Sequence, residues 1–307
     1  MPLQPQGSGQ QVAGAPSRVR VLGKGRRPWK RQELLGLLEA AVVYHEGPLV
    51  AINKPPGLAV TSSPEQLSLV SLLPDLSQRL RLPDELHVVK AAGKEGSGVV
   101  LLSGCPGTTQ QLQAFFTQLR RARRSPTTYY AVTAGVPAAV EGEICTGLTL
   151  EQVGELQLVV PVAAPSHHSV KRKEVRKTMT CYKILGTAPH CALVQLQPVT
   201  AFPSQLLVHL TLLLCPALGD HMYAARVGTV LGEPFLLPVG SAVPRTQVLG
   251  EQLLHRLGLT QQQMHHLPLH LHLHQLLLPT HVVTAPPPPF FLQTLRLLGL
   301  PECLSVL

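Results

Sequence analysis

The amino-acid sequence predicts a mixed α+β fold in which helices flank a largely antiparallel central sheet. Short apolar runs rich in Val, Leu and Thr recur between Gly, Pro and polar turns, which is typical of strands. They alternate with segments in which apolar residues have helical spacing. At 307 residues and 45% hydrophobic content, the chain is long enough and apolar enough to bury a sizeable core.

Composition divides the chain into a basic arm at residues 1–31, one domain at 32–282 and a Pro-rich tail with a short helix at 283–307. Residues 1–32 carry +7 of the net charge of +9, so the remainder carries only +2. A basic start without acidic residues is typical of mitochondrial transit segments. A disordered arm that contacts RNA has the same composition, and we favour the transit segment.

The cysteines and the apolar segments indicate a soluble intracellular protein. The 6 cysteines are scattered without a CxxC pair, which favours a reduced compartment over a disulfide scaffold. The first thirty residues lack the apolar centre of a secretory signal. The longest apolar segment, 206–218, contains His209 and Pro216 and is too short to span a membrane.

Apolar spacing and turn residues predict the elements of the first half in order. We expect a helix at 32–41, two strands around a Pro55-Pro56-Gly57 turn within 42–63, a helix at 65–82 interrupted at Pro74, and strands at 86–89 and 99–102. The loop at 90–98 is rich in glycine, which lets a backbone turn sharply and approach a ligand closely. An ordinary surface turn has the same composition.

The second half is predicted in the same way, although residues 224–264 give no clear pattern. We expect a helix at 107–122 capped by Thr108 or Thr109, strands at 127–134, 178–185 and 191–197, a helix starting at Pro203 and running to 214, and a helix at 290–299 after a Pro run that ends the core. Alternation places His270, His272 and His274 on one strand face. Because no Cys or carboxylate is nearby, we expect a polar strand face there rather than a metal site.

Two basic clusters are candidate contacts for RNA phosphates. They consist of Arg120, Arg121, Arg123 and Arg124, and of Lys171, Arg172, Lys173, Arg176 and Lys177. Cations also suit a helix C-terminus, so part of the first cluster fits simple capping. A solvated loop explains the second cluster equally well. The chain has no phosphate-binding Gly-x4-Gly-Lys-Ser/Thr loop, no GxSxG and no HExxH, so nothing indicates a nucleotide hydrolase or metallohydrolase.

Several segments in order carry a family resemblance. They are Lys54-Pro55-Pro56-Gly57, GKEGSGVVLLS with Ser97-Gly98, TTYYAVTAGVP with Tyr129, the segment from Thr200 through Gln205 and His209 to Gly219-Asp220 and Tyr223, and LHLHQLLLP with His272. Together they resemble the RluA-type pseudouridine synthase family over residues 42 to 280, and most of all its mitochondrial mRNA-modifying branch. The resemblance implies a pseudouridine synthase-like sheet and conversion of uridine to pseudouridine in mitochondrial mRNA or rRNA, in the mitochondrial matrix. It also implies that no metal or cofactor is needed, and that the base is flipped out of the RNA stack.

The sequence departs from the family at the catalytic positions. The family's catalytic aspartate falls on Gly93, and the arginine that pairs with it falls on Leu207. The family's His-Arg falls on Lys90-Ala91, and an earlier arginine falls on Phe202. Losing the aspartate and its arginine together is physically coherent, because an unpaired buried charge would be costly.

The resemblance therefore implies a catalytic site at Glu95, Tyr129 and Gln205. Glu95 is the only acid in the loop and replaces the aspartate if the loop shifts in register, although an exposed turn residue is the alternative. Tyr129 would stack on or hydrogen-bond the flipped base. The alternative function is a catalytically lapsed member that acts as an RNA-binding scaffold with organelle ribosome-assembly factors.

Overall fold

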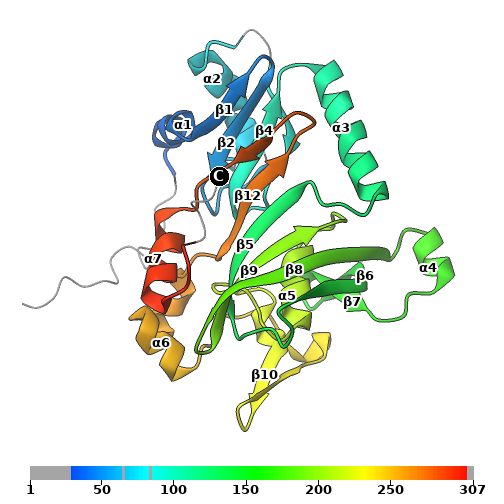
Figure 1. Ribbon diagram of the computed structural model, residues 1–307, viewed down its shortest axis with the longest axis vertical. Coiled ribbons are helices and arrows are strands. Elements are labelled where there is room, and N and C mark those ends of the chain that lie inside the picture. The colour runs from blue at the N-terminus through cyan, green and yellow to red at the C-terminus, as the bar shows by residue number, and fades with distance from the viewer. Residues whose placement is uncertain (1–28, 64–65, 83–84, 303–307) are drawn as a thin grey trace, which may run out of the picture.

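The computed structural model describes residues 29–63, 66–82 and 85–302, and within them one sheet of 11 strands organises the molecule (Figure 1). Its strands are β1 (Val42–Glu46), β2 (Leu49–Lys54), β3 (His87–Lys90), β4 (Ser97–Ser103), β5 (Thr127–Ala134), β6 (Glu141–Val153), β7 (Leu156–Val162), β8 (Arg176–Ala188), β9 (Cys191–Pro198), β12 (Leu271–Leu277) and β13 (Val282–Thr284). A separate hairpin is formed by β10 (Val227–Val230) and β11 (Glu233–Leu236). The helices are α1 (Arg31–Ala40), α2 (Leu69–Arg79), α3 (Pro106–Arg121), α4 (His167–Lys171), α5 (Gln205–Leu212), α6 (Glu251–Leu257) and α7 (Pro289–Leu298), with 3-10 turns at Ala224–Arg226, Val239–Ser241 and Gln261–His266.

The sheet order is β1-β2-β4-β12-β5-β9-β8-β6-β7, with β3 on β4 and β13 on β12. Its described pairings are antiparallel except that of β12 with β4. The predicted mixed fold with a largely antiparallel sheet is confirmed. Because β12 lies between β4 and β5, a strand from late in the chain joins the two halves of the sheet.

Gly98 makes the junction between β4 and β12 sterically feasible. Its φ is +113°, and a Cβ built there would lie 2.1 Å from the backbone oxygen of Leu273. No L-residue with a side chain fits this conformation and this approach. The glycine of the Ser97-Gly98 pair is therefore required by the crossing of two strands.

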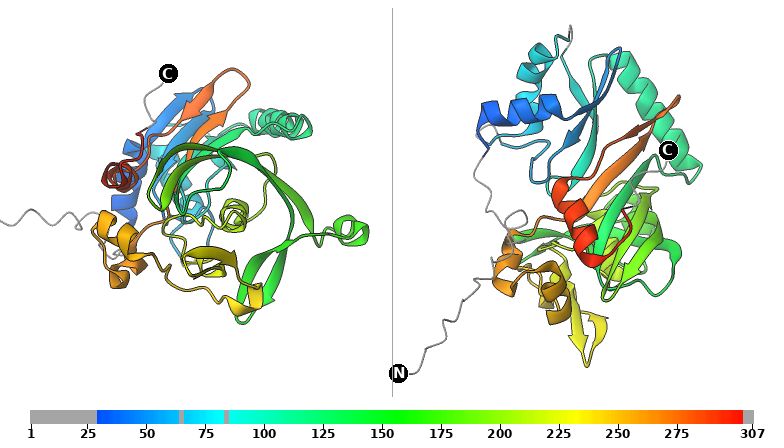
Figure 2. Two further views of the ribbon diagram at one scale, coloured as in Figure 1. Left: turned by 60° about the horizontal axis from the view of Figure 1, so that its bottom comes forward. Right: turned by 60° about the vertical axis from the view of Figure 1, so that its left-hand side comes forward.

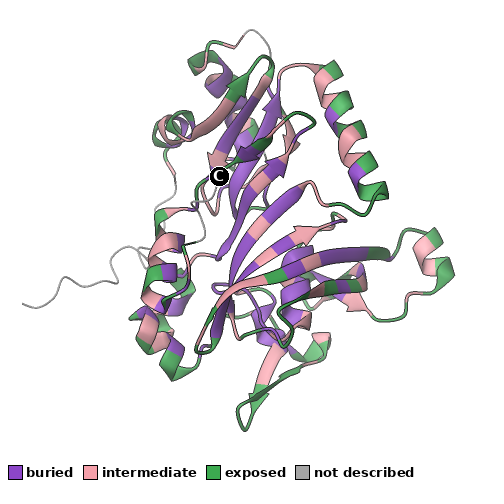
Figure 3. Ribbon diagram, viewed as in Figure 1, coloured by how far each residue is buried: buried purple, intermediate pink, exposed green. Residues whose placement is uncertain are grey.

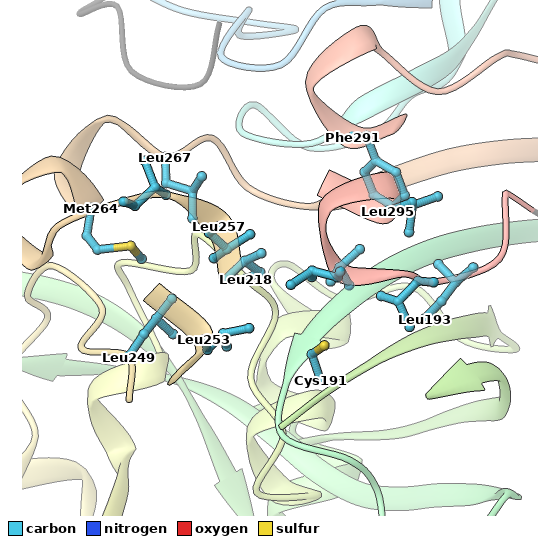
Figure 4. Packing of buried hydrophobic residues seen from close by; sticks show 14 of the residues in the cluster. Cys191, Leu193, Leu218, Leu249, Leu253, Leu257, Met264, Leu267, Phe291 and Leu295 are labelled. Carbon is cyan, nitrogen blue, oxygen red and sulfur yellow. The ribbon is translucent and has the colours of Figure 1, made fainter. Parts of the chain in front are cut away.

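Helices pack on the sheet through their amphipathic faces at two places. Helices α1 and α2 bury leucines against β2 and β4, and α6 and α7 pack over β5 and β9 (Figure 4). Strands β5 to β9 curve around α5, whose residues are largely buried (Figure 2). Helix α3 buries Leu112 and Leu119 and leaves its outer side exposed. Helix α4 has no buried residue (Figure 3).

The predicted Pro-Pro-Gly hairpin is wrong. Strands β1 and β2 are joined at Gly47-Pro48, where Glu46 pairs with Leu49, and the Pro55-Pro56-Gly57 segment follows β2. Gly47 has a φ of +54°, which suits the first central position of a two-residue hairpin turn. The sequence contains two adjacent Gly/Pro turns, and apolar spacing did not distinguish them.

Two predicted helix details are also wrong. Helix α2 continues through Pro74, which lies on its exposed side, where the carbonyl left without an N–H partner is open to water. A capping box between Ser68 and Ser71 begins this helix. Helix α3 begins at Pro106, a favoured first position for proline, and no threonine side chain caps it.

The Pro run does not end the core, because Phe291, Leu295 and Leu298 of α7 are fully buried. Together with α6 they pack over β5 and β9 (Figure 4). The sequence also gave no prediction for β6 and β7, because burial along β6 does not alternate regularly. The boundaries at 31 and 282 remain predictions, and most of the basic arm lies outside the described residues.

The three histidines lie on one side of β12 as predicted, but they are buried and not a solvated polar face. His270 bonds the Thr294 hydroxyl, and His272 and His274 both bond the carbonyl of Ala285. Burial lowers the pKa of His270 and His272 to about 4, so these imidazoles are neutral. In the described part of the chain, no three His, Cys, Asp or Glu side chains gather as metal ligands.

Candidate active site

A cavity of about 610 Å³ opens between the loop at 90–96, the start of β5, the end of β9 and the N-terminus of α5. Glu95, Tyr129 and Gln205 all line it, together with Gly93 and Arg120. These residues are far apart in sequence, so the fold brings together the three predicted catalytic residues and one predicted phosphate contact.

The second half of the loop is held by Lys54, the last residue of β2. Its side chain is completely buried, and the three N–H groups of its Nζ are shared among the carbonyl oxygens of Pro55, Leu58, Lys94 and Gly96, which lie at 2.7–3.1 Å. The backbone N–H of Gly57 also donates to the carbonyl of Lys94. The Lys-Pro-Pro-Gly segment thus fixes the backbone on both sides of Glu95.

Ser97, which directly follows Gly96, is held by His272. The Oγ of Ser97 lies 2.9 Å from His272 Nδ1, and His272 Nε2 lies 2.9 Å from the carbonyl oxygen of Ala285. A carbonyl can only accept, so Nε2 carries the proton and Nδ1 accepts from the Ser97 hydroxyl. The loop is therefore tied to β2 at Lys94 and Gly96 and to β12 at Ser97.

Among the described residues that line the cavity, Glu95 is the only Asp or Glu. Its side chain is 62% exposed, and its Oε1 lies 4.0 Å from Lys94 Nζ, a loose surface ion pair. Glu95 also lines a neighbouring cavity of about 540 Å³, whose wall includes Asp220 and His221. Its carboxylate is thus at the boundary between two cavities and is not held by a buried partner.

Gly93 lies in the cavity wall with free space around its Cα. A Cβ built at Gly93 would meet nothing within 4 Å, and its backbone is not in the left-handed region. An aspartate at this position would therefore fit. Leu207 and Phe202 also line the cavity, so the positions at which the resemblance places arginines present apolar surface instead.

Tyr129 presents a phenol to the cavity. Burial raises its pKa to about 12, so the hydroxyl stays protonated at neutral pH. Within the described residues, no hydrogen bond to this hydroxyl is present, which leaves both its donor and its acceptor capacity for a ligand. The ring and the free hydroxyl suit stacking on a base or hydrogen bonding to its edge.

Gln205 is occupied by protein partners. Its Oε1 accepts from the Thr200 hydroxyl, and its Nε2 donates to the carbonyl of Met179 and to Thr180 Oγ1. From Thr180 the network continues to His209 Nδ1 and from His209 Nε2 to Thr178, whose hydroxyl donates to a backbone carbonyl. Burial lowers the pKa of His209 to about 4. Gln205 is thus placed to fix α5 against β8.

Cations lie at the mouth of the cavity and beyond it. Lys90 and Arg120 line the cavity, and the pKa of Lys90 is lowered by burial and by the nearby Arg120. The predicted RNA-binding residues of both clusters are exposed, at the C-terminus of α3 and around α4 (Figure 1). In the described ranges the clusters contain one ion pair, Arg172 with Glu174 at 3.8 Å.

Residues 48–212 match the family model of RNA pseudouridylate synthases. The chain belongs to the RNA pseudouridylate synthase family, which confirms the resemblance. The mitochondrial mRNA pseudouridine synthase RPUSD3 of Homo sapiens is 55% identical over 278 residues, covering 88% of this chain and 79% of that protein. The Mus musculus protein of that name is 51% identical over 279 residues, covering 88% and 81%. Pseudouridylate synthase RPUSD4, mitochondrial, of Rattus norvegicus is 33% identical, covering 86% and 70%.

Solved structures show the same fold. Human RNA pseudouridylate synthase domain containing 4 superposes with a TM-score of 0.69 at 28% identity, covering 88% of this chain and 97% of that chain. Human RNA pseudouridylate synthase domain containing 1 reaches a TM-score of 0.50 at 17% identity and supports the fold alone. The chain is thus an RNA pseudouridine synthase by family, and its relatives are mitochondrial proteins by name.

Sequence reasoning did not identify Lys54 as the anchor of the loop, because its contacts lie up to 42 residues away. It also did not identify the buried Asp220 as unusual. One oxygen of Asp220 accepts from the N–H groups of Met222 and Tyr223, the other is buried without a partner in the described structure, and burial raises the pKa to about 6. No described helix has the length and apolar character needed to cross a membrane.

Proposed function

We propose that this chain isomerises uridine to pseudouridine in mitochondrial mRNA, with Glu95 as the carboxylate at the reacting nucleotide. The proposal is supported by family membership and by relatives of 51–55% identity that are named mitochondrial mRNA pseudouridine synthases. The observation that carries the residue assignment is that, in the part of the chain that the structure describes, Glu95 is the only carboxylate lining the cavity that Tyr129 also lines.

The isomerisation breaks the bond between C1′ of the ribose and N1 of uracil and forms a bond between C1′ and C5. A proton leaves C5 and N1 gains one, so no redox partner is required. A carboxylate beside the ribose and the base serves such a rearrangement as nucleophile or as general base. Glu95 fits this role on a loop whose backbone Lys54 fixes on both sides, since small displacements of a reacting group cost rate steeply.

The remaining cavity residues hold the nucleotide. The Tyr129 ring contacts the flipped uracil, and Leu207 and Phe202 give it an apolar wall that excludes water. Gln205 positions the wall and does not touch the substrate, because its amide is already bonded. Lys90 and the arginines at the end of α3 contact phosphates on either side of the target, and the cluster around α4 extends the contact.

Mapping of pseudouridine in mitochondrial RNA tests the proposal. Cells carry the wild-type chain, no chain, Glu95→Gln, or the matched control Glu155→Gln, which changes an exposed glutamate at the β6–β7 turn. We expect sites that vanish without the chain and with Glu95→Gln but persist with Glu155→Gln. Sites that persist with Glu95→Gln reject this residue as the carboxylate. If no site depends on the chain, the scaffold function replaces the enzyme.

A further inference from the structure

A second cavity of about 380 Å³ lies beside the candidate active site. Pro126 and Val199 line both cavities, so the two are neighbours with a common wall. Successive side chains of a strand point to opposite faces of a sheet. In β5, Thr127 and Tyr129 line the first cavity whereas Thr128 lines the second, which therefore lies on the other face of this strand.

The second cavity has a cationic rim. Arg123 and Arg124 line it, whereas Arg120, one turn earlier in α3, lines the first cavity. Within the described residues neither Arg123 nor Arg124 forms an ion pair, and Arg123 Nη2 lies 3.5 Å from Met179 Sδ. Arg123 has a φ of +54° at the end of α3, a conformation that usually selects glycine. Arg123 is thus kept at this position although its left-handed backbone conformation costs conformational energy.

The inner wall of the second cavity offers amide and hydroxyl groups. Gln197 donates to Thr128 Oγ1 at 3.2 Å, which leaves its Oε1 without a described partner. The side-chain amide of Gln275 has no described hydrogen bond. It is not one of the buried polar groups that lack a partner, and it lines the second cavity. Amide groups of glutamine can both donate to and accept from the edge of a nucleobase. The arginines at the rim can bind a phosphate, and the glutamine groups that are not yet bonded can bind the edge of a base. Together they match a nucleotide.

We propose that the second cavity binds the base and phosphate of a nucleotide next to the target uridine. This inference rests on the proposed function, because the RNA strand leaves the first cavity past Arg120. It passes around Ser125-Pro126 at the start of β5 and enters the second cavity on the other face of the strand. Arg123 and Arg124 hold the phosphate, and Gln197 and Gln275 bond the edge of the base. The RNA therefore wraps around the beginning of β5.

Photo-crosslinking locates the nucleotides directly. The purified full chain is irradiated with a short oligouridylate that carries 4-thiouridine at one position at a time, and the modified peptides are identified by mass spectrometry. We expect one position to crosslink to the loop at 90–96 or to Tyr129, and a neighbouring position to crosslink to Thr128, Gln197 or Gln275. Crosslinks confined to the first cavity at every position would overturn the inference and leave the proposed function intact. Absence of any crosslink and of any RNA binding would reject both.

Variants give an independent test. Gln275→Leu keeps the side-chain volume and removes the amide, so we expect crosslinking at the second cavity to fall about tenfold while that at Tyr129 is retained. Arg124→Gln changes an exposed side chain and is expected to lower the salt slope of oligouridylate binding by about 0.7. Gln157→Leu, an exposed glutamine on β7, is the matched control. If Gln275→Leu and Arg124→Gln behave as this control does, the second cavity does not bind the RNA.

Discussion

The Nζ atom of Lys54 lies 2.7 Å from the carbonyl oxygen of Gly96, and the same ammonium group donates to the carbonyl of Lys94 at 3.1 Å. Glu95 is the residue between these two carbonyls. A fully buried lysine from the end of β2 thus fixes the backbone on both sides of an exposed carboxylate. The side chain of Glu95 lines both cavities from this fixed position.

Replacing this lysine tests the anchor. Lys54→Met keeps the aliphatic stem but leaves buried carbonyls without a donor, which costs about 1–3 kcal/mol of unfolding free energy per unsatisfied group. We expect lower stability in urea and faster amide hydrogen exchange at residues 91–96. Lys183→Met, an exposed lysine on β8, is the control and should change neither. Unchanged exchange in the loop of Lys54→Met would contradict the anchoring role.

The space at Gly93 tests whether this loop is the catalytic loop of the family. Since a Cβ at Gly93 meets nothing within 4 Å, Gly93→Asp should fold without loss of stability. In a Glu95→Gln background, we expect Gly93→Asp to restore pseudouridine formation in purified RNA, because it places a shorter carboxylate in the same cavity. Adding Leu207→Arg should raise the rate further by giving that carboxylate a cationic partner. A double variant as inactive as Glu95→Gln alone would argue against position 93.

The buried histidines predict how stability depends on pH. Burial lowers the pKa of His209, His270 and His272 from 6.5 to about 4. Between pH 6.5 and 4 the unfolded chain therefore binds more protons than the folded chain. The unfolding free energy therefore decreases as the pH is lowered through this window, by up to about 1.4 kcal/mol per pH unit for each histidine. Above pH 6.5 these histidines add no pH dependence.

Asp220 acts in the opposite direction. Burial raises its pKa to about 6, so the folded chain holds this proton more tightly and Asp220 adds stability as pH falls below 6. Three histidines outweigh one carboxyl, so the net slope stays positive. Urea unfolding at a series of pH values measures the slope of the unfolding free energy against pH. His209→Gln removes one of the three histidines and should reduce this slope by the contribution of one histidine. A flat profile between pH 6.5 and 4 would show that these imidazoles are not buried as described.

The arginine cluster predicts a salt dependence. Neutralising Arg120, Arg121, Arg123 and Arg124 to Gln should reduce the slope of log affinity against log salt by about 3, given about 0.7 per phosphate contact on a single strand. Lys183→Gln, which changes an exposed lysine on β8 outside both clusters, is the control and should leave the slope unchanged. An unchanged slope in the arginine variant, measured by fluorescence anisotropy with labelled RNA, would reject phosphate contacts at the end of α3.

Local apolar patterns in the sequence predicted individual strands well. The strand at 127–134 has the predicted bounds, and β8, β9 and α3 lie within a few residues of their predictions. These segments have clear apolar spacing and clear ends. The hairpin at Gly47-Pro48 was assigned to the wrong turn, because two Gly/Pro pairs lie close together. Strands β6 and β7 were not predicted, since buried and exposed residues do not alternate regularly along them.

The sequence predicted which residues form the candidate site, but it did not predict their contacts with one another and with the rest of the fold. The resemblance brought Glu95, Tyr129 and Gln205 to attention, and the structure places all three around one cavity. That Gln205 is fully bonded to Thr200, Met179 and Thr180 depends on the packing of α5 against β8, which no local pattern contains. The burial of Lys54 likewise depends on strands and loops that meet only in the folded chain.

The central claim is that this family member forms pseudouridine with Glu95 as its carboxylate. The most direct measurement is single-turnover pseudouridine formation by the purified chain on mitochondrial mRNA transcripts, comparing wild type with Glu95→Gln. We expect formation by the wild type and a loss of about a hundredfold or more with Glu95→Gln, which keeps the size of the side chain and removes its charge. Equal rates in the two proteins, or no product from the wild type while RNA is bound, would contradict the claim.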